Sequence, residues 1–194
     1  MPLQKIDNFL SEDLFNLTFE AAEEFLKHGD NVFSTNFTWG EGVRKDSFPV
    51  LCHNICKQSD IYTLLREEIE KKTGMIPYNS HILIYYWTRF SYIPWHQDTK
   101  IIDGVSKQYD GALTVYLNKN WDRDFGGYLL YEDGEEIKAV LPKTNLGIFQ
   151  IGTVQHSTTP VNFDGRVKIT LQVFLKKPNL HITFNKKEGV ENGK

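Results

Sequence analysis

Two histidines and one aspartate have the residue types and the spacing of a metal-binding triad. His96 and Asp98 stand two residues apart in Trp95-His96-Gln97-Asp98, and His156 follows much later in the chain. In a β-strand, the side chains at i and i+2 point to the same face, so we expect His96 and Asp98 to chelate one ion together. The third ligand must then come from a strand that is distant in sequence and adjacent in space. Two imidazoles and one carboxylate form the facial triad of non-haem Fe(II) sites, which leaves coordination positions open for other ligands.

The alternative for His96 and His156 is a pair of hydrogen-bonded core histidines. A lone His-x-Asp does not decide between the two, because this tripeptide pattern arises by chance in most chains. The segments around the triad must therefore supply the rest of the argument.

Two helices are expected in the first half of the chain. Ser11 is a suitable N-cap for an amphipathic helix over Glu12–His28, in which a core-facing stripe recurs at helical spacing (Leu14, Leu17, Ala21 and Phe25). A second helix is expected from about Asp60 to Lys72, with Gly74 as its stop and one apolar face (Ile61, Leu64, Leu65 and Ile69).

Short β segments are expected around and after these helices. A strand-like alternation runs over Val32–Trp39, and seven further segments follow: His81–Trp87, Ala112–Asn118, Gly127–Tyr131, Ile137–Leu141, Gly147–Ile151, Val167–Leu175 and His181–Phe184. Regularly spaced short strands predict a mainly β sandwich or barrel, with the N-terminal helices covering one sheet face. We expect a single domain over residues 1–185 and a flexible C-terminal tail over residues 186–194.

Composition and charge narrow the function classes. The 194 residues carry a net charge of −3, which argues against broad nucleic-acid binding. The two cysteines, Cys52 and Cys56, lack the second cluster that structural zinc needs, so we expect them to be buried or indifferent thiols. With no basic-then-apolar N-terminal segment and no apolar run near the ~20 residues of a membrane span, a cytoplasmic protein without membrane contact is expected.

An ordered set of segments extends the triad pattern. It consists of Ile6–Ser11, Tyr92–Asp98, Val115–Trp121, Gly126–Leu129 and His156–Val161, followed by Arg166 and Ile169–Leu171. This set resembles the prolyl-4-hydroxylase-like 2-oxoglutarate oxygenases, and the stretch from Tyr116 to Trp121 is particularly similar to the prolyl hydroxylases that act on hypoxia-inducible factor. The resemblance covers about residues 6 to 175. It implies a double-stranded β-helix (jelly-roll) core.

The resemblance also implies a cofactor set and the residues that bind it. His96, Asp98 and His156 would bind Fe(II), with 2-oxoglutarate and O2 as co-substrates and ascorbate as a candidate reductant. The far carboxylate of 2-oxoglutarate needs a buried, permanently charged partner, and Arg166 would supply a bidentate one.

Further roles follow from the same resemblance. The Tyr116 hydroxyl would also reach the far carboxylate, unless it is a plain core tyrosine. Thr170 would lie beside Arg166, and Tyr86 would lie near the iron end of the co-substrate. Gly126-Gly127 would allow a tight turn or a close backbone approach near the mouth of the site, unless it is an ordinary hairpin turn. Thr99–Tyr109 is either a lid over the substrate or a passive surface loop.

One position departs from the family pattern. Six residues after Arg166 this chain has Gln172, where the hypoxia-sensing prolyl hydroxylases carry a tryptophan and the AlkB-type nucleic-acid demethylases carry an arginine. Gln172 therefore argues against the demethylases and places the prolyl-hydroxylase pocket in question. Arg89 and Trp95 are candidates for substrate contact.

Taken together, these residues predict a 2-oxoglutarate oxygenase that hydroxylates a prolyl or similar side chain of a protein or peptide substrate. A small-molecule substrate such as a free amino acid is the second hypothesis. A non-catalytic sensor of 2-oxoglutarate or iron is the third. A nucleic-acid substrate is not expected, and the sequence does not give the oligomeric state.

Overall fold

The computed structural model describes residues 3–29, 32–34, 50–99, 101–102, 105–106 and 109–178. The strand expected over His181–Phe184, the tail over residues 186–194 and most of the strand expected over Val32–Trp39 lie outside the described residues. The division into a domain over residues 1–185 and a tail therefore stays a prediction.

A larger antiparallel sheet forms the centre of the molecule. Its eight strands are β1 (Leu3–Ile6), β2 (Val32–Ser34), β3 (Leu51–Asn54), β4 (Ile76–Pro77), β5 (Leu83–Trp87), β9 (Gly111–Tyr116), β12 (Gly147–Ile151) and β14 (Lys168–Lys176). Seven of them follow the order β1-β12-β9-β14-β5-β3-β2, and β4 pairs with β14. The last strand, β14, thus lies in the middle of the sheet, between β9 and β5.

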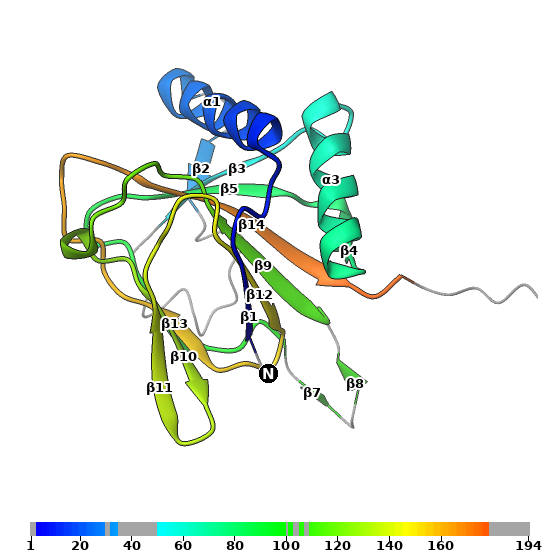
Figure 1. The fold of residues 1–194 in the computed structure, drawn as a ribbon, viewed down its shortest axis with the longest axis vertical. Coiled ribbons are helices and arrows are strands. Elements are labelled where there is room, and N and C mark those ends of the chain that lie inside the picture. The colour runs from blue at the N-terminus through cyan, green and yellow to red at the C-terminus, as the bar shows by residue number, and fades with distance from the viewer. Residues whose placement is uncertain are drawn as a thin grey trace, which may run out of the picture.

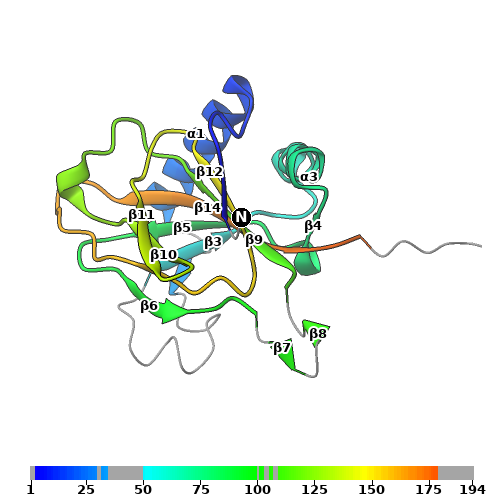
Figure 2. The ribbon, with the colours of Figure 1, turned by 60° about the horizontal axis from the view of Figure 1, so that its bottom comes forward.

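A smaller antiparallel sheet faces the larger one. It contains β6 (Ile93–His96), β10 (Leu129–Asp133), β11 (Glu136–Val140) and β13 (His156–Thr158) in the order β11-β10-β13-β6. Figures 1 and 2 show these strands on the side of the larger sheet that is opposite to the helices. Short additional elements are the hairpin of β7 (Ile101–Ile102) and β8 (Val105–Ser106) and the 3-10 turns η2 (Tyr78–Ser80) and η3 (Arg123–Phe125). Two antiparallel sheets connected in this way form the predicted double-stranded β-helix.

Both predicted helices are present and cover the outer face of the larger sheet. The first, α1 (Glu12–His28), begins at Ser11, whose hydroxyl accepts a hydrogen bond from the backbone nitrogen of Leu14 at 3.4 Å. The second, α3 (Asp60–Thr73), ends at Gly74, which adopts the left-handed conformation with φ 67°. Glycine is favoured at this position because it has no Cβ to clash.

The predicted helix stripes were partly wrong. The buried residues of α1 are Leu14, Phe15, Thr18 and Ala22, whereas Leu17 is 45% exposed. In α3, Leu65 and Ile69 are buried as expected, but Leu64 is 45% exposed. Leu17 and Leu64 both line a surface groove between the two helices, so part of each predicted stripe faces this groove and not the core.

Strand alternation divides the core into two layers. On β9, Leu113 and Val115 pack with the helices, whereas Tyr116 packs in a second cluster with Leu129 and Tyr131 of the smaller sheet. The inner face of the larger sheet is therefore the face that meets the smaller sheet. No helix within the described ranges is long and apolar enough to cross a membrane.

Candidate metal centre

His96 and His156 meet across a strand pair of the smaller sheet. β6 ends at His96 and β13 begins at His156, and the two residues are direct antiparallel partners. Their ring centroids lie 4.2 Å apart. Pairing of strands thus brings together two side chains that are far apart in the sequence.

Asp98 joins the two histidines from just beyond the end of β6. The expectation that His96 and Asp98 share one strand therefore holds for His96 alone, because Asp98 lies in the bend that follows. The next residue fixes this bend, since the backbone nitrogen of Thr99 donates to the carbonyl of Gly152 at 2.8 Å. Asp98 is held toward the sheet in spite of lying outside it.

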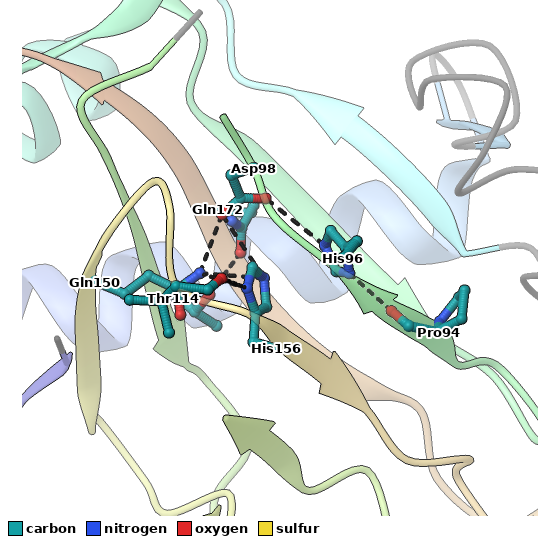
Figure 3. Close-up of polar contacts among 8 residues, drawn as sticks. Pro94, His96, Asp98, Thr114, Gln150, His156 and Gln172 are labelled. Carbon is teal, nitrogen blue, oxygen red and sulfur yellow. Dashed lines mark hydrogen bonds and ion pairs between the residues drawn. The ribbon is translucent and has the colours of Figure 1, made fainter. Parts of the chain in front are cut away.

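The three side chains converge on one point (Figure 3). One ligand atom from each of His96, Asp98 and His156 lies within 4.8 Å of the others. Asp98 Oδ1 is 3.7 Å from His96 Nε2, and Asp98 Oδ2 is 3.7 Å from His156 Nε2. These side chains are 14%, 8% and 8% exposed for His96, Asp98 and His156. A single ion between them would be largely shielded from solvent.

Backbone carbonyls orient both imidazole rings. His96 Nδ1 lies 2.8 Å from the carbonyl oxygen of Pro94, and His156 Nδ1 lies 2.8 Å from that of Val154. A carbonyl oxygen only accepts, so Nδ1 carries the hydrogen in both rings and Nε2 keeps its lone pair. Burial and the neighbouring His156 lower the pKa of His96, which favours the neutral ring that binds metals. This donor set fits Fe(II) with an open face.

Lys168 is a buried cation on the inner face of the larger sheet. It is 2% exposed, and its ammonium donates to the carbonyl of Gly127 at 3.0 Å and lies 4.0 Å from the centre of the Trp87 ring. Desolvation lowers the pKa of Lys168 to about 7. Among the described residues no carboxylate forms an ion pair with it. A buried ammonium in this state is a strong site for an anion.

Gly127 makes room for this lysine, and Gly126 lies close to the backbone of Pro160. Gly127 has φ +71°, and a Cβ there would lie 3.0 Å from Lys168 Cδ and 3.2 Å from Lys168 Nζ. A Cβ on Gly126 would lie 2.3 Å from the carbonyl oxygen of Pro160. The indole nitrogen of Trp121 donates to the Gly126 carbonyl at 3.0 Å and fixes the turn. Of the two alternatives for Gly126-Gly127, the close approach is the one observed.

Thr170 and Tyr116 lie beside Lys168. Thr170 is two residues further along β14 and accepts a hydrogen bond from the indole nitrogen of Trp87 at 3.0 Å. Tyr116 is the cross-strand partner of Thr170, and its side chain is buried in the inner layer. Burial raises the pKa of Tyr116, so its hydroxyl stays a donor. Both side chains lie on the inner side of the larger sheet, and their contact with a ligand stays a prediction.

Two expected site residues lie elsewhere. Arg166 precedes β14 and is exposed, and its guanidinium reaches only the carbonyl of Asn120, at 3.4 Å. Tyr86 faces the helices, where its hydroxyl donates to the carbonyl of Ala22 at 2.9 Å. The structure therefore corrects the expectation of a buried Arg166 and of Tyr86 near the iron end. Tyr85, which precedes Tyr86 on β5, lies on the inner side of the sheet and packs with Trp87.

The sequence analysis missed Lys168 and Gln150. Alternation puts residues 166, 168 and 170 on the same face of a strand, so this pattern does not distinguish Arg166 from Lys168. The start of β14 at Lys168 decides between them. Gln150 donates from Nε2 to Asp98 Oδ2 at 3.0 Å, and no motif in the sequence pointed to it.

Trp95 and Arg89, the candidates for substrate contact, both lie outside the group of metal ligands. Trp95 is 40% exposed on β6, where alternation turns it away from the side of His96. Arg89 forms an ion pair with Asp164 on the loops that join the strands. Thr99 both donates to and accepts from the backbone of Tyr109, which closes the loop that contains β7 and β8. Closure of this loop over a substrate stays a prediction.

Comparisons with solved structures show which proteins have a similar fold. The chain matches a Pseudomonas putida prolyl-4-hydroxylase with a TM-score of 0.67 at 16% identity, over 91% of this chain and 92% of that one. It matches a Trichoplax adhaerens prolyl hydroxylase in complex with a hypoxia-inducible-factor peptide with a TM-score of 0.70 at 14% identity, over 91% and 84%. The viral collagen prolyl hydroxylase of Paramecium Bursaria Chlorella virus-1 matches with a TM-score of 0.62 at 18% identity, over 90% and 96%.

No family model and no curated protein sequence matches this chain. The structural matches establish that the chain has the fold of the prolyl 4-hydroxylases over about nine-tenths of its length. The resemblance read from the ordered segments is confirmed at the level of the fold.

Proposed function

We propose that this protein is an Fe(II)- and 2-oxoglutarate-dependent oxygenase that hydroxylates a prolyl or similar side chain of a peptide. The observation that carries the proposal is the convergence of His96, Asp98 and His156 inside a barrel with the fold of the prolyl 4-hydroxylases. Their Nε2 and carboxylate oxygen atoms would hold the metal. When bound, Fe(II) with 2-oxoglutarate and O2 supplies the oxidation that hydroxylates a C–H bond and leaves succinate and carbon dioxide.

Lys168 takes the role that the sequence analysis gave to Arg166. 2-Oxoglutarate carries a carboxylate at each end, so an enzyme that chelates one end through the metal needs a cation for the other. Lys168 is the buried cation on the inner face, and an anion beside it restores the charged form that burial disfavours. Thr170 and Tyr116 provide hydroxyl groups next to it.

Lys168 and the triad lie at different levels along the inner face of the larger sheet, which suits a molecule that spans them. Lys168, Thr170 and Gln172 alternate onto the inner face. Gln172 pairs with Thr114 of β9, and two residues before Thr114 stands Ala112, which pairs with Gln150, the residue that contacts Asp98. Four residues of extended strand span about 13 Å. The side chain of Lys168 and a five-carbon dicarboxylate fill this distance together. The apolar residues around Trp87, including Trp121 and Val161, exclude water from the lysine end.

If Lys168 and not Arg166 is the cation that binds 2-oxoglutarate, the position six residues after it also moves by two residues along the chain. Six residues after Lys168 stands Phe174, an aromatic residue at the place where the hypoxia-sensing prolyl hydroxylases carry tryptophan. The Phe174 ring stacks on Tyr109 with centroids 4.4 Å apart. The doubt that Gln172 raised about a prolyl pocket therefore loses its basis, and no arginine of the demethylase type stands at this position either.

The peptide substrate is supported by the Trichoplax adhaerens relative, which was solved with a peptide bound. The test is succinate formation from 2-oxoglutarate with Fe(II), O2 and a library of proline-containing peptides, with and without ascorbate, against free proline as the small-molecule comparison. We expect peptide-dependent succinate that is lost in His96→Ala. Turnover with free proline but with no peptide would favour the hypothesis of a small-molecule substrate. Binding of 2-oxoglutarate without turnover of any substrate would favour the hypothesis of a non-catalytic sensor.

A further inference from the structure

Gln150 contacts two of the three triad residues from the opposite sheet. It lies on β12 of the larger sheet, whereas His96 and His156 belong to the smaller sheet and Asp98 follows it. Its side-chain nitrogen, Nε2, is 3.0 Å from Asp98 Oδ2 and 3.1 Å from His156 Nε2 (Figure 3). The residue is 5% exposed.

We propose that Gln150 is a positioning residue that presents Asp98 to the metal through a single oxygen, Oδ1. This inference rests on the proposed function, because it concerns the same centre. An amide N–H only donates, so it occupies a lone pair of Oδ2. Each carboxylate oxygen lies 3.7 Å from an imidazole nitrogen, Oδ1 from His96 Nε2 and Oδ2 from His156 Nε2, so the amide bond to Oδ2 is what distinguishes them and leaves Oδ1 for the ion. A carboxylate that binds through one oxygen leaves more coordination positions open than a bidentate one.

The same amide nitrogen also contacts the His156 ring. Gln150 Nε2 lies 3.1 Å from His156 Nε2 and 3.3 Å from His156 Nδ1, so it lies over the ring, while the Nδ1–H donates to the Val154 carbonyl. This contact leaves the in-plane lone pair of His156 Nε2 for a metal, and the bond from Gln150 to Asp98 Oδ2 persists when the ion is bound. Gln150 thus holds Asp98 and His156 in convergent positions before the ion arrives, which lowers the cost of ordering them on binding.

The other end of the Gln150 amide supports this assignment. Its carbonyl oxygen, Oε1, is buried and has no hydrogen-bond partner among the described residues. Leaving a buried acceptor unpaired costs about 1–3 kcal/mol. An interaction elsewhere in the site must therefore favour this orientation of the amide over the reversed one. Turning the amide over would place Oε1 against the Asp98 carboxylate, which repels it. The metal ligands therefore dictate the orientation.

Gln172 provides the matched contrast on the same inner face. Its Oε1 accepts a hydrogen bond from the Thr114 hydroxyl at 2.6 Å, and no hydrogen bond joins it to the triad within the described part of the chain. Replacing Gln172 by leucine removes a half-buried amide on the same inner face and leaves the contacts of the metal ligands intact.

The test is a titration with Co(II), which reports the coordination of the site through its visible absorption. Outer partners of metal ligands contribute about 10- to 100-fold to metal affinity. We expect Gln150→Leu to raise the Co(II) dissociation constant by about this factor and to alter the visible spectrum as the Asp98 carboxylate changes its binding mode. Gln172→Leu should bind Co(II) within about twofold of the wild type and with the same spectrum.

The outcomes separate this inference from the proposed function. If the folded wild type binds no Co(II), the metal centre itself is refuted. If the wild type binds Co(II) and Gln150→Leu binds it with the same affinity and spectrum, the metal centre stands and the positioning role is overturned. Leucine removes an unpaired buried acceptor, so the variant should fold; Gln150→Met, of similar length, gives the same comparison if it does not.

Discussion

The ammonium group of Lys168 lies 4.0 Å from the centre of the Trp87 ring, and the two residues are direct partners on β14 and β5. A ring face stabilises a cation less than an anion does, and burial lowers the pKa of Lys168 to about 7. The proposal that Lys168 would bind the far end of 2-oxoglutarate has measurable consequences.

Substitution of Lys168 should weaken the binding of 2-oxoglutarate, whereas substitution of Arg166 should leave it nearly unchanged. Lys168→Met removes the buried charge, so the dissociation constant for 2-oxoglutarate should rise by about 10- to 100-fold, the contribution of a charged hydrogen bond. Arg166→Met should change it by less than about twofold, because Arg166 is exposed and bonded only to Asn120. Calorimetric titration with Mn(II) in place of Fe(II) measures both. A loss confined to Arg166→Met would restore the original assignment.

The stability of the protein should rise with pH above neutrality because of Lys168. Its pKa in the folded state, about 7, lies below the ordinary lysine value of 10.5 that the unfolded chain has. Between these two values the unfolded state binds a proton that the folded state lacks, so the free energy of unfolding increases with pH, by at most about 1.4 kcal/mol per pH unit. Urea unfolding from pH 6.5 to 9.5 should show this rise in the wild type relative to Lys168→Met. Parallel pH profiles would contradict the burial of an unpaired lysine.

Gly127 should be required for ligand binding and Gly134 should not. Both have a positive φ, of +71° and +68°, so alanine at either position pays a similar backbone cost of about 1–2 kcal/mol. A Cβ at Gly127 also meets Lys168 at 3.0 Å, whereas a Cβ at Gly134 meets nothing within 4 Å. Gly127→Ala should therefore weaken 2-oxoglutarate binding beyond any effect of Gly134→Ala. Equal affinities in the two variants would show that the close approach does not matter for the ligand.

Substitutions of two buried tyrosines should have different effects, one on the stability of the fold and the other on the binding of 2-oxoglutarate. Tyr86→Phe loses the hydrogen bond to Ala22 and should lower the free energy of unfolding by about 1 kcal/mol with unchanged affinity for 2-oxoglutarate. Tyr116→Phe should weaken 2-oxoglutarate binding by about tenfold, because its hydroxyl lies on the ligand side of the sheet. Denaturant unfolding and calorimetry on the same samples make the comparison. The reverse pattern would mean that the two tyrosines have exchanged roles.

Much of the fold was predictable because its signals are local. The helix limits follow from Ser11 and Gly74, and β12 has the predicted bounds of Gly147–Ile151. The strands that carry the histidines were not predicted as separate segments, since β6 has four residues and β13 has three. Such strands are too short to show an alternation. The exposed Leu17 and Leu64 illustrate a further limit, because helical periodicity does not say where the sheet lies.

The triad was predictable from residue type and spacing, whereas the residues that support it were not. Pairing of β6 with β13 brings His96 and His156 next to each other. The order of the segments in the sequence already suggested that these two residues meet. Lysine is rarely buried without a partner, so chemical preference favoured Arg166 over Lys168. Only the three-dimensional arrangement shows that Gly127 and Trp87 create a place for a lysine. The contacts of Gln150 cross between two sheets, and no local pattern encodes them.

The most direct test of the central claim is the visible charge-transfer band of the chelate, recorded without oxygen after adding Fe(II) and 2-oxoglutarate. The account predicts a band in the wild type, no band in His156→Ala, and a band in Lys168→Met only at much higher 2-oxoglutarate concentrations. A folded wild-type protein that shows no band at saturating Fe(II) and 2-oxoglutarate would contradict the account, because His96, Asp98 and His156 would then not form a working iron centre.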